Sequence, residues 1–378
     1  MFKIVAGCYE QLVLGYEVIS QKTTNEDLEL SWKSAFTDHS QQGCIKCVAS
    51  NDTFVATGSS DETICLYDLQ LDQELGSLVG HRGAINQLVF PDKKHLISCS
   101  DDGDICVWEA AVDGSLLKTL KGHKGPVTSF AIHPSGKLGI SASMKDGTLR
   151  TWNMIIGRSV YVKNFKKHQI EFVRWSKDGM HYITASQHFV QIYELDSAKC
   201  VHEFESGNAI MTVEVTQINN KAAVVFGDSG GNINIYSIPD GVCMCKYKAH
   251  ENRVKSVYPF SPPPSCGQSK NGCWIASASS DGKIIVWKVN TLSVEEKTYE
   301  GYQILTIDTG ARLTCVTVWC HTDDQIDDAD PKEGAVTEEK TQIMSDQVLE
   351  STKKKKLRKR KNNEVADVDT FKKSLLTS

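Results

Sequence analysis

A unit of a little over forty residues recurs along this chain, and each clear copy carries the same polar and aromatic residues in the same order. One copy runs from His81 to Trp108, and the next runs from His123 to Trp152. The two histidines are 42 residues apart and the two tryptophans are 44 residues apart. A repeat of this length cannot bury an apolar face alone, so successive copies have to stack against one another.

Each copy contains short strand-like runs separated by turns rich in Asp, Gly, Ser and Pro. In the copy that includes Trp108 these runs are Ala84–Phe90, His95–Ser100, Ile105–Trp108 and Ser115–Leu120. Four short strands are the content of one blade of a β-propeller. The repeat length, together with the aromatic residue and polar neighbour that close the third strand, resembles the WD40 repeat. The resemblance implies an all-β fold, a seven-bladed WD40 β-propeller.

Six blades can be placed by the aromatic residue near the end of the third strand. These residues are Tyr67, Trp108, Trp152, Tyr193, Tyr236 and Trp287. We expect His39 to begin the polar pattern of the first blade and His168 to begin that of the fourth.

The two ends of the repeat region supply the seventh blade. The run Ile4–Glu17 aligns with Val55–Asp68, glycine on glycine and tyrosine on tyrosine, so the chain begins in the middle of a blade. Arg312–Trp319 is expected to form a single apolar strand that completes this blade. Closing the ring in this way removes an exposed sheet edge. We therefore predict one propeller over residues 1–320.

Polar residues recur at fixed places in three of the repeats. A histidine before the first strand, a serine of the second strand, an aspartate of the next turn and a tryptophan of the third strand can form one hydrogen-bonded chain, as their burial requires. In the copy that includes Trp152 the serine is displaced by one residue. The three quartets are His81, Ser98, Asp102 and Trp108; His123, Ser141, Asp146 and Trp152; and His250, Ser277, Asp281 and Trp287.

Ser, His and Asp also make up a nucleophilic triad, but a catalytic set occurs once in a chain, whereas these sets recur. We predict that the quartets are structural, that the protein is not an enzyme and that it needs no cofactor. Cys44 and Cys47 form an isolated CxxC, and Cys243 and Cys245 form an isolated CxC. Without a second pair at zinc-finger spacing, neither predicts a metal site.

Two middle blades depart from the repeat. Gln187 stands where the fourth blade should carry its turn aspartate, and Asp228 comes two residues too early in the fifth. The sequence leaves open whether these blades were freed for binding or have simply drifted. An insertion, Ser261–Gly272, contains three consecutive prolines and is expected to be a surface loop, either a recognition segment or an inert one.

The composition excludes several classes of protein. The net charge of −5 over 378 residues gives no general attraction to nucleic acid or to anionic membranes. No apolar run is long enough to span a bilayer, and the N-terminus lacks the features of a secretory signal. The thirteen cysteines are therefore expected to be reduced thiols in a cytosolic or nuclear protein.

The composition changes after Trp319, and we predict a disordered charged tail over residues 321–378. Asp323–Asp330 is acidic, whereas Lys353–Lys361 is a basic run. We interpret the run as a nuclear and nucleolar address; a polybasic membrane patch and a solvated charge run are the alternatives. Any contact with RNA through it would be non-specific and salt-sensitive. Its basic residues are Lys353, Lys354, Lys355, Lys356, Arg358, Lys359, Arg360 and Lys361.

Four features together resemble the family of PAK-interacting WD-repeat proteins. They are the start FKIVAGCYEQLVLGYE, the closing strand RLTCVTVW, the degenerate middle blades and the Lys-rich terminus. The resemblance implies a monomeric, non-catalytic scaffold with protein partners and no membrane partner. It implies binding and restraint of p21-activated kinase, and a nucleolar role with pre-ribosomal assembly factors in biogenesis of the large (60S) ribosomal subunit.

The alternative is a substrate receptor or adaptor of a ubiquitin ligase or of another nuclear complex. Such receptors commonly carry an arginine two residues after the aromatic-polar pair. The corresponding residues here are Gln70, Ala111, Ile155, Asp196, Pro239 and Asn290. A heterotrimeric G-protein β subunit would need a long helix before its first blade, which this chain lacks because it begins inside a blade.

Overall fold

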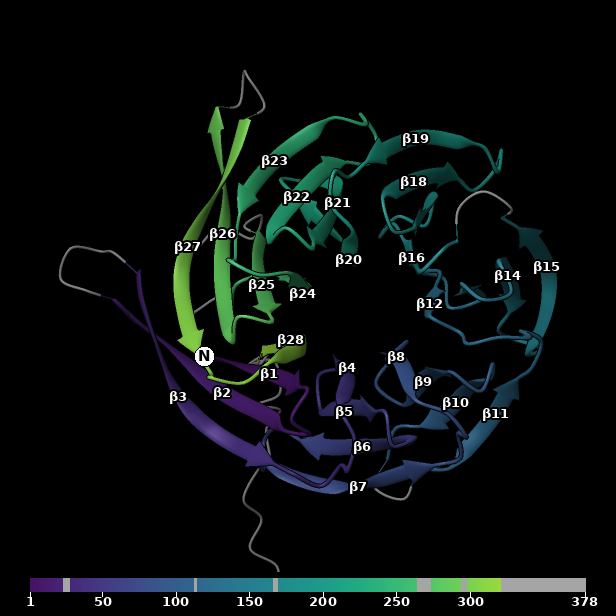
Figure 1. The fold of residues 1–378 in the computed structure, drawn as a ribbon, viewed down its shortest axis with the longest axis horizontal. Helices are drawn as coiled ribbons and strands as arrows, with labels where there is room; N and C mark the ends of the chain where they lie inside the picture. Colours follow the sequence, from purple (N-terminus) through teal and green to yellow (C-terminus); the bar gives the residue numbers. More distant parts are fainter. Residues whose placement is uncertain (23–27, 112–113, 166–168, 264–272, 294–297, 321–378) are drawn as a thin grey trace, which may run out of the picture. The chain divides into compact units, whose positions relative to one another are not determined.

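The computed structural model describes residues 1–378 except 23–27, 112–113, 166–168, 264–272, 294–297 and 321–378. The described residues form 28 strands, arranged as seven antiparallel sheets of four strands each. The sheets stand radially, like the blades of a ring (Figure 1). The predicted all-β, seven-bladed propeller is confirmed. Within the described part of the chain, no helix is long and apolar enough to cross a membrane.

We number the blades in chain order, each from its inner to its outer strand. Blade one is β4 (Ile45–Ser50), β5 (Phe54–Ser59), β6 (Thr63–Asp68) and β7 (Gln73–Val79). Blade two is β8 (Ile85–Val89), β9 (His95–Ser100), β10 (Ile105–Glu109) and β11 (Leu116–Leu120). Blade three is β12 (Ser129–Ile132), β13 (Leu138–Ser143), β14 (Thr148–Asn153) and β15 (Arg158–Asn164). Blade four is β16 (Phe172–Trp175), β17 (His181–Ala185), β18 (Phe189–Glu194) and β19 (Cys200–Glu205).

Blade five is β20 (Ile210–Ile218), β21 (Lys221–Asp228), β22 (Asn232–Ser237) and β23 (Cys243–Lys248). Blade six is β24 (Val254–Phe260), β25 (Cys273–Ser279), β26 (Lys283–Ser293) and β27 (Thr298–Asp308). Blade seven is β28 (Leu313–Cys320), β1 (Phe2–Cys8), β2 (Val13–Lys22) and β3 (Leu28–Asp38).

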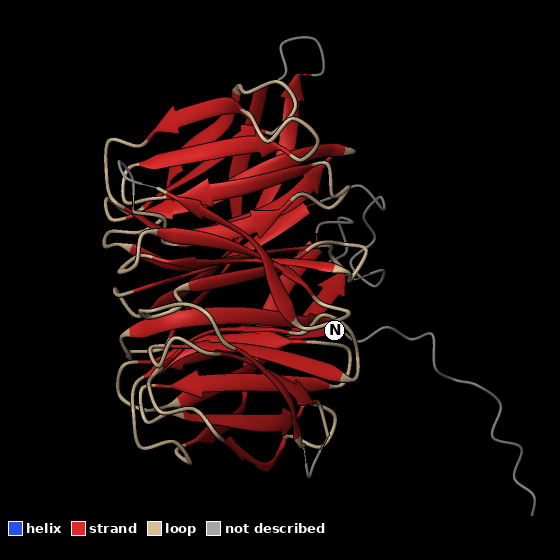
Figure 2. Ribbon diagram, turned by 90° about the vertical axis from the view of Figure 1, so that its right-hand side faces the viewer, coloured by secondary structure: helices blue, strands red, loops and turns tan. Residues whose placement is uncertain are grey.

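The first strand of each blade lines the centre of the ring and the fourth strand forms its outer wall (Figure 1). The turns between strands therefore lie on two opposite faces (Figure 2). The second strand of each blade is covered by sheets on both sides, so nearly all of its residues are buried instead of alternate ones. Every residue of β1 and β25 is buried, whereas most of β15 is exposed.

The seventh blade joins the two ends of the repeat region, as the sequence predicts. β1 pairs with β28 on one side and with β2 on the other, with Ile4 opposite both Val318 and Tyr16. Trp319 of β28 also donates its indole N–H to the backbone carbonyl of Asp52 in blade one, at 2.9 Å. The closing blade is thus tied to its neighbour by side chains as well as by packing.

The alignment of Gly7 with Gly58 has a steric cause. A Cβ on Gly58 would lie 2.6 Å from Ile85, the first residue of the inner strand of blade two. A Cβ on Gly7 would meet Ile45, the equivalent residue of blade one. In both blades the glycine makes room for the buried residue that begins the next blade.

The structure also differs from the expected blade pattern. Blade six does not end its third strand near Trp287, because β26 continues to Ser293 and pairs with an equally long β27. β2 and β3 of the adjoining blade are similarly long. The expected insertion falls between β24 and β25, and most of it, 264–272, lies outside the described residues. The predicted tail, 321–378, also lies outside them.

Candidate functional site: the turn-bearing face and the central channel

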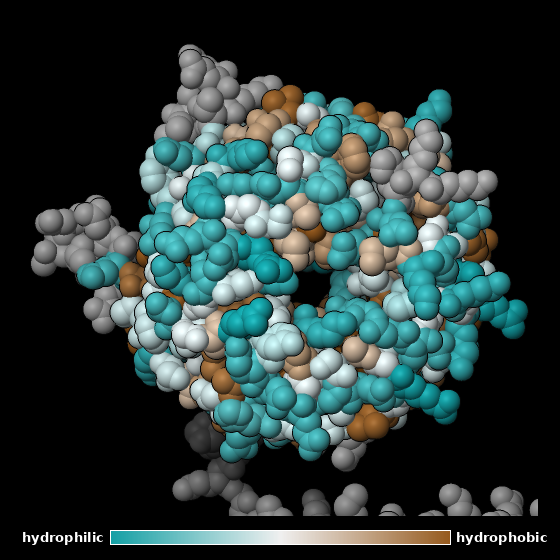
Figure 3. All heavy atoms as spheres, viewed as in Figure 1, coloured by the Kyte–Doolittle hydropathy of each residue, from teal (hydrophilic) through white to brown (hydrophobic). Residues whose placement is uncertain are grey.

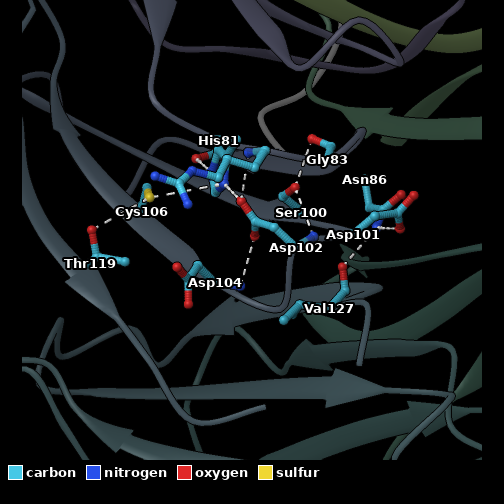
Figure 4. A network of polar contacts seen from close by, with 12 residues as sticks. His81, Gly83, Asn86, Ser100, Asp101, Asp102, Asp104, Cys106, Thr119 and Val127 are labelled. Carbon is cyan, nitrogen blue, oxygen red and sulfur yellow. Dashed lines mark hydrogen bonds and ion pairs between the residues drawn. The ribbon is translucent and has the colours of Figure 1, made fainter. Parts of the chain in front are cut away.

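The blade-two quartet forms one buried hydrogen-bonded chain. His81 Nδ1 lies 2.8 Å from Asp102 Oδ2, and His81 Nε2 lies 2.7 Å from Ser98 Oγ. The indole N–H of Trp108 donates to the same Ser98 oxygen, also at 2.7 Å. Every polar atom is satisfied if Nδ1 carries the imidazole proton and the serine hydroxyl donates to Nε2. Figure 4 shows His81 directed at Asp102.

The aspartate of this quartet also holds its own turn. The backbone N–H groups of Arg82 and Asp104 donate to the Asp102 carboxylate at 2.9 and 2.8 Å. Figure 4 shows Asp102 and Asp104 in this turn. Burial alone would raise the pKa of Asp102, but these two hydrogen bonds and the one with His81 outweigh it and lower the pKa. The carboxylate is therefore kept ionised by the turn that it organises.

Blades three and six repeat this geometry. In blade three, His123 lies 3.0 Å from Asp146 and 2.7 Å from Ser141, which accepts from Trp152 at 2.8 Å. In blade six, the distances are 3.1 Å for His250 to Asp281, 2.8 Å for His250 to Ser277 and 2.9 Å for Trp287 to Ser277. The serine displaced by one residue in blade three thus reaches the same partners.

The quartets contain serine, histidine and aspartate linked in the order of a nucleophilic triad, but a substrate cannot reach their serines. Ser98, Ser141 and Ser277 are fully buried, and each hydroxyl oxygen also accepts a hydrogen bond from an indole N–H. A substrate carbonyl cannot approach such an oxygen without opening the blade. The arrangement satisfies buried polar groups and fixes the turns on one face of the ring.

The expectation that His39 begins the polar pattern of blade one is wrong, because His39 is exposed. Gln41 occupies the place of the histidine: its amide oxygen accepts from the Thr57 hydroxyl at 2.7 Å, and its amide nitrogen donates to the Thr63 carbonyl at 3.0 Å. Tyr67, in place of the tryptophan, donates to Asp38 at 2.8 Å. Thus the amide and the phenol replace the imidazole and the indole. His168, expected to serve blade four, lies outside the described residues.

In blade five, Asp228 holds the turn with a set of hydrogen bonds that differs from the quartet. This carboxylate replaces a serine two residues before the usual aspartate and accepts from the backbone N–H groups of Gly230 and Asn232, both at 2.9 Å. The Asn232 side chain adds a further hydrogen bond at 2.9 Å. The early aspartate therefore holds the turn without a histidine. In blade four, the Thr184 hydroxyl at the serine position has no partner among the described residues.

A central channel of about 440 Å³ is lined by the inner strands of all seven blades, and Figure 3 shows an opening at the centre of one face. Arg174 and Glu214 of neighbouring blades form an ion pair across part of its wall, at 2.6 Å. A ring of seven residues lies near the start of the inner strands. Each blade contributes one of them, and each follows a buried apolar residue. They are Lys46, Asn86, Thr128, Glu171, Met211, Lys255 and Thr314.

The sequence does not reveal this ring through a motif, because its members are about forty residues apart and differ in type. The signal that could have found it is positional: each residue follows a buried apolar residue at, or just before, the start of an inner strand. Two of its members are electrostatically unusual, since burial raises the pKa of Glu171 and lowers that of Lys255. A second hollow, of about 600 Å³, includes Glu171 and the turn of blade four that carries Gln187.

The outer wall carries a group of exposed apolar side chains on the β14–β15 hairpin. They are Ile155, Ile156, Val160, Tyr161 and Val162. Ile155 is 73% exposed and Tyr161 is 60% exposed. An exposed apolar group of this kind is typical of a protein-binding surface. No three or more His, Cys, Asp or Glu side chains of the described residues are placed to hold a metal ion.

Comparison with known proteins places this geometry in a family. A family model described as WD domain, G-beta repeat, matches residues 31–68, 72–109, 114–153 and 241–288. Each match includes the outer strand of one blade and the first three strands of the next, so the sequence unit is offset from the blade by one strand. The unmatched stretch between 154 and 240 contains blade four and the first three strands of blade five, two blades that lack the quartet.

Relatives match across most of the propeller. The p21-activated protein kinase-interacting protein 1-like of Danio rerio is 41% identical over 317 residues, which are 84% of this chain and 80% of the relative. The p21-activated protein kinase-interacting protein 1 of Homo sapiens is 36% identical over 319 residues, which are 84% of this chain and 77% of the relative. This chain belongs to the p21-activated protein kinase-interacting family of WD40 proteins.

The likeness to this family extends to fungi at lower identity. Shk1 kinase-binding protein 15 of Schizosaccharomyces pombe is 27% identical over 312 residues, which are 80% of this chain and 83% of the relative. The family resemblance inferred from the N-terminal segment, the closing strand, the degenerate middle blades and the basic terminus is therefore confirmed. The family is one of WD40 propellers, whose loops and walls provide binding surfaces.

Proposed function

We propose that this protein is a non-catalytic scaffold that binds a p21-activated kinase and restrains its activation. The observation that carries the proposal is the likeness across 84% of the chain to relatives named for interaction with this kinase. The fission yeast relative is named for binding another kinase, Shk1. The complete burial of the serine in all three Ser-His-Asp sets supports a binding role over a catalytic one.

We assign the exposed apolar group of the β14–β15 hairpin to the kinase contact. Five exposed apolar side chains belong to this hairpin, Ile155 and Ile156 in its turn and Val160, Tyr161 and Val162 in β15. Apolar and aromatic anchors on a pre-formed surface supply most of the affinity of a protein interface, because few groups have to be ordered on binding. Tyr161 and Ile155 are the anchors with the largest exposed fractions in or near β15.

The test uses the full chain, a purified p21-activated kinase and the GTPase that activates it. We expect the chain to bind the kinase and to lower its activation without being phosphorylated in stoichiometric amount. The double variant Ile155→Ser/Tyr161→Ser should weaken binding by at least about tenfold, as expected for the loss of two interface anchors. The control Val201→Ser/Val242→Ser removes two exposed apolar side chains elsewhere and should change binding little.

Two results would contradict the proposal in different ways. Activation that is unaffected by the wild-type chain would remove the inhibitory role. Binding that is lost equally in the test and control variants would remove the assignment to the β14–β15 hairpin while leaving the role intact.

We also propose that the protein acts in the nucleolus, in maturation of the large ribosomal subunit. The support is the basic run at Lys353–Lys361 and the resemblance described above. Depletion of the protein should lower large-subunit precursors relative to small-subunit precursors, measured by pulse labelling of ribosomal RNA. Equal loss of both classes, or loss of neither, would argue against this role.

A further inference from the structure

A compact group of hydrogen-bond donors without partners among the described residues lies where blades five, six and seven meet, on the face of the ring that carries the quartet aspartates. A hollow of about 520 Å³ there has Arg253, Arg312, Glu251 and two serines, Ser229 and Ser280, among its lining residues. Arg253 precedes the inner strand of blade six, and Arg312 precedes that of blade seven. The two arginines, 59 residues apart in sequence, therefore converge because consecutive inner strands are neighbours around the ring.

These side chains have no polar partner within the described part of the chain. Neither guanidinium forms an ion pair there with a carboxylate, and the Arg312 guanidinium instead lies over the ring of Tyr9, at 5.1 Å. The hydroxyls of Ser229 and Ser280 likewise take part in no hydrogen bond among the described residues. The hollow thus presents two planar cations and two hydroxyls, all free to donate.

A third cation borders the group. Lys255 follows Arg253 by two residues and belongs to the ring of the central channel. Burial lowers the pKa of its ammonium, and the positive charges of Arg253 and Arg312 lower it further. The carboxylate of Glu171 offsets only part of this repulsion among like charges, and a bound anion would reduce it further.

We propose that this hollow is a recognition site for a phosphorylated serine or threonine in a partner polypeptide. The paired guanidiniums match the oxygens of a phosphate monoester, because each can donate two parallel hydrogen bonds. Recognition of phosphorylated segments by arginine clusters is a general mode of peptide binding. The site stands independently of the kinase assignment, since it lies on blades five to seven and not on the β14–β15 hairpin.

The surroundings favour a single phosphate over the backbone of RNA. A groove for single-stranded nucleic acid needs cations along a track, with aromatic side chains on which successive bases stack. Here Glu251 lies within the lining of the hollow, and Glu10 accepts a hydrogen bond from the backbone N–H of Arg312 at 3.1 Å. A polyanion running past these carboxylates would bring several phosphates close to negative charge, whereas a peptide with one phosphate between uncharged residues would bring only that one, which the two guanidiniums can neutralise.

The experiment measures binding of two fluorescent probes to the full chain by fluorescence polarisation at physiological salt. One probe is a peptide pool with a central phosphoserine flanked by mixed residues, compared with the same pool containing serine. The other is a single-stranded RNA. We expect the phosphorylated pool to bind the wild-type chain at least about tenfold more tightly than the serine pool, the effect of charge-assisted hydrogen bonds to one dianion.

The double variant Arg253→Gln/Arg312→Gln should lose this preference and keep the melting temperature of the wild type. The control Arg82→Gln/Lys124→Gln removes two exposed cations from equivalent turns on the same face and should keep the preference. The variant Arg253→Lys/Arg312→Lys retains both charges but not the paired donors, so it should bind with intermediate affinity. That variant also provides the test if the glutamine variant is unstable.

Three outcomes would overturn the proposal. The first is equal binding of the phosphorylated and serine pools by the wild-type chain. The second is the same loss of preference in the glutamine variant and in its control. The third is a loss of RNA binding, instead of phosphopeptide binding, in the Arg253→Gln/Arg312→Gln variant, which would assign the hollow to nucleic acid.

Discussion

The ammonium of Lys3 donates a hydrogen bond to the backbone carbonyl of Leu69 at 2.6 Å, although the two residues are 66 positions apart. Lys3 belongs to the closing blade and Leu69 follows the third strand of blade one. The same ammonium forms an ion pair with Asp72 at 2.6 Å. Lys3 is 7% exposed, so a charged group is buried at the closure of the ring, and its partners there are essential.

Replacing Lys3 with methionine should destabilise the propeller. The variant keeps the aliphatic stem but leaves the Leu69 carbonyl without its donor. We expect a loss of about 1–3 kcal/mol in the free energy of unfolding, the usual cost of removing a charged hydrogen-bond partner from a buried group. The measurement is chemical denaturation of the purified chain.

The control for this prediction is Asp72→Asn, which keeps the hydrogen bond between Lys3 and Leu69. The Asp72 side chain is 34% exposed, so its ion pair contributes less, within about 1 kcal/mol. Equal destabilisation by the two variants would show that the closure depends on the ion pair and not on the carbonyl.

Replacing Ser98 with alanine should destabilise blade two, where we assign this serine a structural role and not a catalytic one. The change leaves Nε2 of His81 and the indole N–H of Trp108 without a partner in the core, whereas His81 Nδ1 keeps Asp102. Each unsatisfied buried group costs about 1–3 kcal/mol, so we expect a loss of about 2–5 kcal/mol in stability. Ser115→Ala removes an exposed hydroxyl from the same blade and should have little effect. A Ser98→Ala protein as stable as the wild type would show that water replaces the hydroxyl.

The repeat was sufficient to predict the ring, the split blade and the members of three quartets, because each follows from fixed spacing. The repeat did not predict the role of Gln41, because a search for histidine does not detect an amide that makes equivalent hydrogen bonds. Nor did the repeat predict the channel ring or the Arg253–Arg312 hollow. Those groups are assembled from residues in different blades, and no local pattern links them before the ring is closed.

Neutralising the basic run Lys353–Lys361 should abolish nucleolar accumulation of a fluorescently tagged chain. Replacement of its eight lysines and arginines by glutamine removes the charge on which recognition of such an address depends. Replacing the aspartates of Asp323–Asp330 by asparagine changes the charge of the same tail and should leave accumulation intact. Unchanged nucleolar signal in the glutamine variant would contradict the interpretation of the run. The measurement is live-cell imaging.

Stability should fall as the pH is lowered from 7 towards 5, and His250 should contribute to that fall. Burial lowers the pKa of His250 below its ordinary value of 6.5, an effect that the charge of Asp281 only partly offsets. The folded state therefore binds fewer protons than the unfolded state in this range. The stabilisation is complete above the unfolded pKa and is lost as the pH falls through and below that value.

The variant His250→Gln separates this titration from the rest of the protein. Gln41 shows that an amide can serve the same position in blade one, so the variant should fold. We expect its melting temperature to decline less steeply between pH 7 and pH 5 than that of the wild type, because one titrating group has been removed. His39→Gln changes an exposed histidine and should keep the wild-type slope. An unchanged slope in His250→Gln would place the pH dependence in the other quartets, where burial likewise lowers the pKa of His123.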